Sequence, residues 1–380
     1  MKPNRIFGIS RASMNIDWIL FFALLPLIFF GLVTMSSFTG ENYLAIKQII
    51  WVSISLAIFF MFSVIDWRFL KRSDLLVSLF ILSCTILAAL FLARSIKGAK
   101  SWFDLGSVSL QPADFVKIVV ILILAKYFSR RHIEIANVKH IFISGIYAFI
   151  PFVLILLQPA LGSAMIIFFI WIGMVTVSGV SKKHLLAVFV IGLICFAVLW
   201  GTVLKRYQKD RILTFIDPFQ DIKGAGYNAF QSQIAVGSGE LFGKGIGYGT
   251  QSRLKFLPEY QTDFIFAAFA EEWGFFGVVF LLFFFGVVIW RILYNSLRGA
   301  SNFETLFGVG LAVFLMSHFT INVGMNMGLL PVTGITLPFV SYGGSHLLTE
   351  FAGLGILMGM RKYSRATHRD NMKNEFFGPI

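Results

Sequence analysis

Apolar runs of roughly 20 residues recur along the whole chain, and short polar stretches separate most of them. An α-helix needs a run of about this length to cross a lipid bilayer. We therefore predict an all-α polytopic membrane protein with ten membrane-spanning helices. Their ranges are 17–38, 48–65, 74–93, 111–129, 141–157, 160–179, 184–204, 263–292, 302–327 and 336–360. Pro159 divides two of these runs because proline ends or kinks a helix, so Gln158 and Pro159 are expected to form a turn.

One long stretch breaks the pattern, because residues 205–262 are rich in charged residues, glycine and amide side chains. Loops of this length are usually either functional or disordered. The aromatic and β-branched residues of this stretch argue against disorder. We expect a large extracytoplasmic loop between the seventh and eighth helices. The whole chain, 1–380, is expected to form one membrane domain that ends in a cytoplasmic tail at 361–380.

The composition supports this assignment, with 57% hydrophobic and only 13% charged residues. The net charge of +13 does not indicate nucleic-acid binding, because the basic residues are spread over short loops rather than gathered on one face. With the N-terminus in the cytoplasm, the inside segments carry 19 Lys and Arg, whereas the short outside loops carry 4. The positive-inside rule therefore places both termini in the cytoplasm and the 205–262 insert outside.

The two cysteines and the N-terminus add little chemistry. Cys84 and Cys195 lie in apolar runs, so we expect buried thiols and no disulfide framework. No small-residue cleavage site follows the first apolar run, which is therefore expected to remain as an uncleaved span.

Ionisable residues inside apolar spans are costly, and each is a candidate for function. The candidates are Asp114, Lys117, Glu271, Glu272, His318, His346 and Glu350. Asp114 and Lys117 are three residues apart, which suits a local ion pair as well as a substrate site. The histidines are isolated in the sequence and are expected to find partners on neighbouring helices. No metal-ligand spacing is present, so no cofactor is evident, and the sequence leaves a divalent-cation requirement open.

Asp263 stands at the outer end of the eighth predicted span, where the long insert ends. Thr262 or Asp263 could simply cap the helix that follows. Alternatively, a carboxylate at the membrane edge could remain ionised and accept a proton from a hydroxyl. Spacing alone favours the cap.

The glycine-rich run at 237–245 does not form a nucleotide-binding motif. A phosphate-binding loop needs a glycine where the chain has Ser238, and a hydroxyl where it has Gly245. The dinucleotide fingerprint fails as well, because Phe242 occupies the place of its third glycine. These glycines are expected to permit tight turns and a close approach of the backbone to a ligand.

Taken in order, several motifs resemble the SEDS family (shape, elongation, division and sporulation). They are Gln158-Pro159-x-Leu-Gly162, Asp217-Pro218, Gly226-Tyr-Asn228, Gly237-Ser-Gly239, Leu257-Pro-Glu259, Thr262-Asp-Phe-Ile-Phe266, Gly328-Leu-Leu-Pro331-Val-Thr-Gly334 and Leu337-Pro-Phe-Val-Ser341-Tyr-Gly-Gly344-Ser345. The forms around Glu271 and Pro331 resemble the elongation branch, RodA, more than the division branch, FtsW.

The resemblance implies a ten-helix peptidoglycan glycosyltransferase that polymerises lipid II outside the cytoplasmic membrane, with a class B penicillin-binding protein and other elongation proteins as partners. The family's essential aspartate falls on Asp263. The candidate substrate-binding residues are Lys47, Gln48, Lys100, Trp102, Asp114, Lys117, Arg211, Arg253, Glu259 and Ser341. The chain departs from the family pattern at Ser101, Ala160 and His346, and Asp114 replaces the more usual glutamate.

The mechanism expected from this resemblance is an inverting transfer with one carboxylate. Asp263 would take the proton from the acceptor hydroxyl, while lysine and arginine side chains stabilise the pyrophosphate leaving group. Two other functions suit ten spans with sparse charge. One is a flippase or transporter for a lipid-linked precursor, although we find no internal repeat. The other is a membrane scaffold without catalytic activity.

Overall fold

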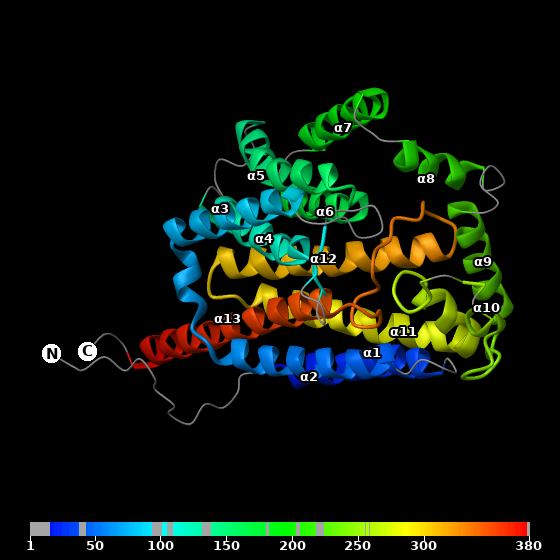
Figure 1. Ribbon diagram of the computed structural model, residues 1–380. Coiled ribbons are helices and arrows are strands. Elements are labelled where there is room, and N and C mark those ends of the chain that lie inside the picture. The colour runs from blue at the N-terminus through cyan, green and yellow to red at the C-terminus, as the bar shows by residue number, and fades with distance from the viewer. Residues whose placement is uncertain are drawn as a thin grey trace.

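The computed structural model describes residues 16–37, 43–92, 101–104, 109–130, 138–179, 182–202, 206–217, 224–254, 256–257 and 259–377. Within these residues the chain is almost entirely helical (Figure 1). The long helices are α1 (Trp18–Ser36), α2 (Tyr43–Val64), α3 (Ser73–Ala89), α4 (Pro112–Arg130), α5 (Val138–Leu157), α6 (Leu161–Val177), α7 (Lys182–Thr202), α11 (Ile265–Leu297), α12 (Asn302–Asn326) and α13 (Gly344–Phe377). Each predicted apolar run overlaps one of these helices, and the predicted fold class is confirmed.

Length and composition distinguish the helices that are suited to cross a membrane. Among the described residues, six helices are long and apolar enough: α1, α2, α3 with its extension to Leu92, α5 from Lys139, α11 and α12. The apolar helix α6 is shorter, with 17 residues. Charged residues set α4 and the second half of α13 apart from these helices.

The helices form a bundle in which α12 and α13 run through the middle (Figure 1). The α13 helix packs along α2, and α1 packs along α11. On the other side, α12 contacts α4 and α6. The core is rich in phenylalanine; Phe285 and Phe319, for example, stack with their ring centroids 4.0 Å apart across α11 and α12. Cys84 is only partly buried, so the expectation of a fully buried thiol is wrong at this position.

Asp17 fixes one end of the bundle. Its Oδ1 accepts hydrogen bonds from the N–H groups of Ile19 and Leu20, which caps α1. Its Oδ2 accepts from Arg291 (2.6 Å) and Asn295 (2.6 Å) on α11. A single carboxylate thus joins the start of α1 to α11.

The insert between α7 and α11 is not an irregular loop throughout, as the sequence pattern suggested. It contains the helices α8 (Arg206–Ile216), α9 (Ala225–Ser238) and α10 (Thr250–Arg253). Figure 1 shows α9 and α10 at one end of the bundle, and the C-terminal part of α13 at the opposite end. The insert therefore adds helical structure at the end where α11 begins.

A break in α11 joins the insert to the bundle. Gly274 has φ 66° and ψ −168°, a conformation that is essentially limited to glycine. In a continuous helix, the N–H groups and carbonyls around Gly274 would pair with one another. Here they form hydrogen bonds with the insert instead. The pairs are Lys244 N to Glu271 O, Gly245 N to Glu272 O, Phe275 N to Glu240 O and Phe276 N to Leu241 O, at 2.9 to 3.1 Å.

The last helix begins later than predicted. The apolar run from 336 was expected to be helical, but α13 starts at Gly344, and residues 336–343 form a compact irregular segment. Pro338 has no N–H to donate to a helix, and Phe339 has φ 63°, in the left-handed region. Below we call residues 336–343 the turn segment.

Two short 3-10 helices and one small hairpin complete the described chain. The 3-10 helices are η1 (Trp67–Lys71) and η2 (Leu90–Leu92). The strands β1 (Phe103–Asp104) and β2 (Ser109–Leu110) pair antiparallel just before α4. The backbone N–H of Gln111 then donates to Oγ of Ser345, at 3.2 Å, which joins this hairpin to the start of α13.

Candidate active site

Asp263 lies in the last turn before α11, at the end of the bundle that carries the insert. The turn is built on Glu259, whose carbonyl accepts hydrogen bonds from the N–H groups of Thr262, Asp263 and Phe264 at 3.1 to 3.2 Å. Glu259 itself has φ 48°, a left-handed conformation that is uncommon outside glycine. The turn directs the chain from the insert into α11, and Asp263 is partly exposed there.

Two buried asparagines on α12 hold the backbone of Asp263. The carbonyl of Asp263 accepts hydrogen bonds from Nδ2 of Asn322, at 2.9 Å, and from Nδ2 of Asn326, at 3.0 Å. These residues are four apart, so they lie on one face of the helix. Asn322 also donates to the carbonyl of Ile335, at 2.6 Å, which joins the site to the chain just before the turn segment.

The capping role favoured by spacing for Asp263 is wrong. The N-cap position of α11 is Phe264, which makes no side-chain capping bond. Instead, Oδ1 of Asn326 accepts the N–H of Ala267 in the first turn of α11, at 3.2 Å. A residue from another helix thus satisfies an N–H group that a local cap would normally serve. The N–H of Ala267 at the start of α11 is therefore satisfied from α12.

The turn segment lies against the residues that precede Asp263, because Ser341 bonds to Thr262 and the N–H of Tyr342 donates to the carbonyl of Gln261. Oγ of Ser341 donates to the carbonyl of Thr262, at 2.6 Å, and accepts the N–H of Leu337, at 2.8 Å. Gln48 on α2 donates from Nε2 to the carbonyl of Ser341, at 3.0 Å. Gln48 and Ser341 were predicted to bind substrate. In the structure both side chains are buried and hold the turn segment in place.

The other predicted substrate-binding residues lie in different places. Lys47 is partly exposed on α2, with its Nζ 4.3 Å from the centroid of the Tyr43 ring. Trp102 precedes β1, and Arg253 is exposed at the end of α10. Lys100 lies outside the described residues, as does the side chain of Arg211 on α8.

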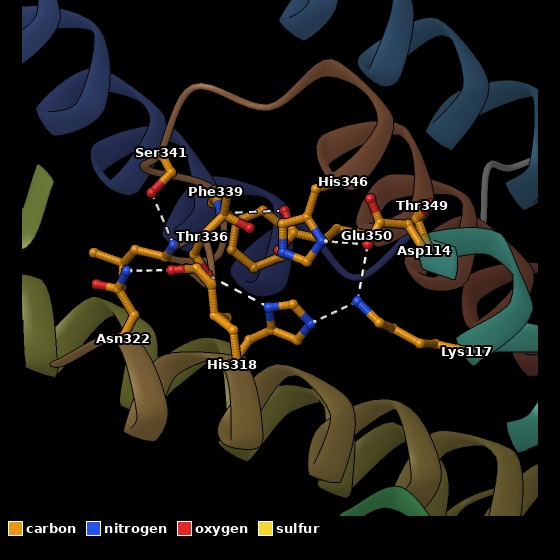
Figure 2. A network of polar contacts seen from close by, with 12 residues as sticks. Asp114, Lys117, His318, Asn322, Thr336, Phe339, Ser341, His346, Thr349 and Glu350 are labelled. Carbon is orange, nitrogen blue, oxygen red and sulfur yellow. Dashed lines mark hydrogen bonds and ion pairs between the residues drawn. The ribbon is translucent and has the colours of Figure 1, made fainter. Parts of the chain in front are cut away.

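Asp114 and Lys117 form the ion pair that their spacing suggested. Nζ of Lys117 lies 2.9 Å from Oδ1 of Asp114, and both side chains are almost completely buried. The same Nζ lies 3.2 Å from Nε2 of His318 on α12. The pair therefore belongs to a larger polar cluster in the middle of the bundle, which also includes His346 and Glu350 on α13 (Figure 2). A role for Lys117 toward a phosphate group stays a prediction.

Glu271 and Glu272 hold the insert rather than an open site. Oε1 of Glu271 accepts from Nζ of Lys244, at 2.7 Å, and from the N–H of Thr250, at 2.8 Å. Oε1 of Glu272 accepts a hydrogen bond from Oγ of Ser37, the residue that follows α1, at 2.7 Å. It also accepts the N–H of Gly247. These intramembrane carboxylates fasten the loop at 244–251 to the break in α11.

Sequence reasoning missed the two asparagines of α12. It searched the spans for ionisable side chains, whereas Asn322 and Asn326 are neutral. The available signal was a pair of amides four residues apart in a largely apolar run, since unpaired amides are costly in hydrocarbon. In the part of the chain that the structure describes, no group of three or more His, Cys, Asp and Glu side chains is arranged to hold a metal ion.

The fold and these intramembrane polar contacts define a multi-pass α-helical membrane protein, with a carboxylate at the junction of a large insert and a transmembrane helix. The sequence profile of the FtsW/RodA/SpoVE family, described as cell cycle proteins, matches residues 12–366. The chain therefore belongs to this family, which is also known as the SEDS family.

Individual relatives agree with this assignment. The chain is 36% identical to stage V sporulation protein E of Bacillus subtilis over 86% of its length and 89% of that protein. It is 39% identical to the peptidoglycan glycosyltransferase MrdB of Escherichia coli, over 72% of each chain. It is 33% identical to the probable peptidoglycan glycosyltransferase FtsW of Haemophilus influenzae, over 92% and 91% of the two chains.

Solved structures show the same fold. A chain from a peptidoglycan synthase complex matches with a TM-score of 0.78 and 31% identity, over 92% of this chain and 98% of that chain. The rod shape determining protein RodA of Thermus thermophilus matches with a TM-score of 0.69 and 30% identity, over 91% of this chain and 96% of that chain.

Proposed function

We propose that this protein is a peptidoglycan glycosyltransferase that polymerises lipid II into glycan strands, with Asp263 as its general base. The proposal rests on the way in which neighbouring residues hold Asp263. The backbone of Asp263 is held by Asn322 and Asn326, and Asn326 also caps α11. The carboxylate is thus placed by other residues at a partly exposed position. Two relatives named as peptidoglycan glycosyltransferases support the reaction class.

The reaction would be an inverting transfer at the outer membrane face. Asp263 would accept the proton of the C4 hydroxyl of the acceptor sugar as its oxygen attacks the anomeric carbon of the donor. The C–O bond to undecaprenyl pyrophosphate would break in the same step. Pyrophosphate is a good leaving group, so a second carboxylate that acts as a general acid is not required, unlike in glycoside hydrolysis. The lipid tail would remain in the membrane beside the helices.

Cations near the site would stabilise the charge that develops on the pyrophosphate. The candidates on this chain are Lys47, Lys100, Lys117, Arg211 and Arg253. In the described structure, Lys47 and Arg253 are at least partly exposed, whereas Lys117 is buried against Asp114. Lys47 and Arg253 therefore have the better access to a charged substrate in this conformation.

We further propose a role in cell-wall elongation in the cytoplasmic membrane, with both termini inside and a class B penicillin-binding protein as partner. The motifs around Glu271 and Pro331 favour the elongation branch. A peptidoglycan synthase complex among the similar structures supports such a partner.

Substitution Asp263→Asn tests the base directly. We expect the variant to insert and fold, because the amide has nearly the same size, and to lose glycan polymerisation, because it cannot accept the proton. The measurement is strand formation from labelled lipid II by purified protein in nanodiscs, alone and with the penicillin-binding protein. Asp210→Asn, which changes an exposed carboxylate on α8, is the matched control and should retain activity.

Two results would overturn the proposal at different levels. Near-normal polymerisation by Asp263→Asn would remove this residue from the mechanism. Absence of polymerisation by the wild-type protein, with and without the partner, would remove the reaction itself. In that case, lipid II translocation in proteoliposomes would distinguish a flippase from a scaffold.

A further inference from the structure

Five ionisable side chains from three helices meet in the middle of the bundle, on the inner side of the turn segment (Figure 2). They are Asp114 and Lys117 on α4, His318 on α12, and His346 and Glu350 on α13. Each is at most 6% exposed. Charges buried to this extent are stable only when they are paired. The arrangement of protons in this cluster is therefore constrained by its geometry.

His346 lies between two carboxylates. Its Nε2 is 2.9 Å from Oε1 of Glu350, and its Nδ1 is 3.6 Å from Oδ1 of Asp114. A neutral imidazole carries one N–H, so its other nitrogen would present a lone pair to a carboxylate. An imidazolium carries a positive charge that attracts both carboxylates, and these contacts are ion pairs rather than hydrogen bonds of normal geometry. The geometry thus favours a positive charge on His346.

The charge count of the cluster agrees. The carboxylates of Asp114 and Glu350 are balanced by the ammonium of Lys117 and by one further cation. His318 does not provide that cation, because its Nε2 lies 3.2 Å from Lys117 Nζ, which can only donate. The remaining proton of His318 is on Nδ1, which faces the carbonyl of Thr336 at 3.4 Å. The two histidine rings stack, with centroids 4.3 Å apart.

The cluster is connected to the turn segment through Glu350. Its Oε2 accepts the N–H of Phe339, at 3.1 Å. Phe339 has φ 63°, and such a conformation persists only where the surroundings hold it in place. In the same turn, Ser341 bonds to the carbonyl of Thr262, the residue before Asp263. A continuous series of contacts therefore runs from His346 through Glu350 and the turn segment to the backbone beside Asp263.

We infer that His346 is a positioning residue: as an imidazolium it neutralises Asp114 and Glu350, keeps Glu350 on the N–H of Phe339, and so fixes the turn segment that supports Asp263. The inference rests on the proposed function only where it links this position to catalysis. His346 is not proposed to touch the substrate. It acts through the conformation of residues 336–343.

Substitution His346→Gln tests this role, because it removes the positive charge and retains a polar side chain. Two carboxylates would then share one ammonium, and the bond from Phe339 to Glu350 would weaken. We expect amide hydrogen exchange in peptides that cover 336–342 to become about tenfold faster in nanodiscs. Polymerisation should fall about 10- to 100-fold in kcat with little change in KM, because Asp263 would be displaced rather than lost.

The double variant His346→Gln with Glu350→Gln separates charge from packing. It removes one charge of each sign, and the amide oxygen at position 350 can still accept the N–H of Phe339. We expect it to restore slow exchange in 336–342, and most of the activity, relative to His346→Gln alone. His140→Gln is the matched control, since His140 is a buried histidine on α5 that lies against Tyr127, outside the cluster.

Each outcome decides one question. Unchanged exchange in His346→Gln, or a double variant that is no better than the single one, would overturn the inference, because a ring that only fills space predicts no recovery. If the exchange pattern follows the expectation while the wild-type protein forms no glycan, the positioning role stands and the proposed function fails. Size-exclusion profiles of all variants show whether each is folded.

Discussion

Asn326 shows how much a single buried amide can organise in an apolar bundle. Its Nδ2 donates to the carbonyl of Asp263, and its Oδ1 accepts the N–H of Ala267 in α11. The hydroxyl of Ser232 on α9 donates to the carbonyl of Asn326, at 2.9 Å. One residue therefore joins the insert, the turn before α11 and the first turn of α11. Polar groups buried in this way are costly when their partner is removed.

Substitution Asn326→Ala should therefore destabilise the protein by about 1–3 kcal/mol, because the N–H of Ala267 loses its acceptor. Polymerisation should fall as well, because one of the two bonds to the backbone of Asp263 is lost. Thermal unfolding in detergent and the lipid II assay measure the two effects. Asn302→Ala, at the exposed start of the same helix, is the control. Equal stability of the two variants would contradict the assigned role.

At the scale of elements, the break in α11 explains how a long polar insert is held against a membrane helix. Gly274 interrupts the helix, and the freed backbone groups bond to residues 240–245. Non-helical backbone at membrane depth is tolerated only where such groups find partners within the protein. Glu271 adds side-chain bonds to the same loop. The insert and α11 thus form one connected unit beside Asp263.

Substitution Gly274→Ala tests this unit. A side chain at φ 66° and ψ −168° is strained, by about 1–3 kcal/mol. The added methyl group would also meet the backbone of residues 241–243. We expect a clearly lower unfolding temperature and faster proteolysis of the insert.

Gly286→Ala is the control on the same helix, because nothing lies within 4 Å of the added methyl group. A helix-interior glycine is less favourable than alanine by roughly 0.5–1 kcal/mol, so this variant should be as stable as the wild type or slightly more stable. A Gly274→Ala protein that behaves like Gly286→Ala would show that the break is not required.

At the scale of the whole molecule, different elements lie at the two ends of the bundle. One end holds α9, α10 and the turn before α11, and the other holds the C-terminal part of α13 (Figure 1). The distribution of lysine and arginine predicts that the first end is outside and the second is in the cytoplasm. In the proposed reaction, the lipid-linked donor would therefore bind at the first end, outside the cell, where the polymer is made.

Single-cysteine labelling checks this orientation, in a background where Cys84 and Cys195 are replaced by serine. Tyr248→Cys, in the insert at a position that is 68% exposed, should react with a membrane-impermeant maleimide in intact cells. Asn302→Cys, at the start of α12, should react only after permeabilisation. The reverse pattern would place the insert in the cytoplasm and exclude an outward-facing site.

The sequence by itself determined the helical class, the approximate positions of the long helices and the family. It could do so because a bilayer demands apolar runs of fixed length, and because the family's motifs are local in the sequence. The same local reasoning placed Asp114 and Lys117 in an ion pair, since their contact lies within one turn of helix.

Only the tertiary structure decided which polar groups meet. His318, His346 and Glu350 are far from Asp114 and Lys117 in the sequence, and they form one cluster because α4, α12 and α13 bring them together. The cap of α11 comes from Asn326 on α12, and Glu350 on α13 accepts the N–H of Phe339 in the turn segment. Apolar periodicity carries no information on these contacts, because each depends on how buried amides and charges of different helices satisfy one another.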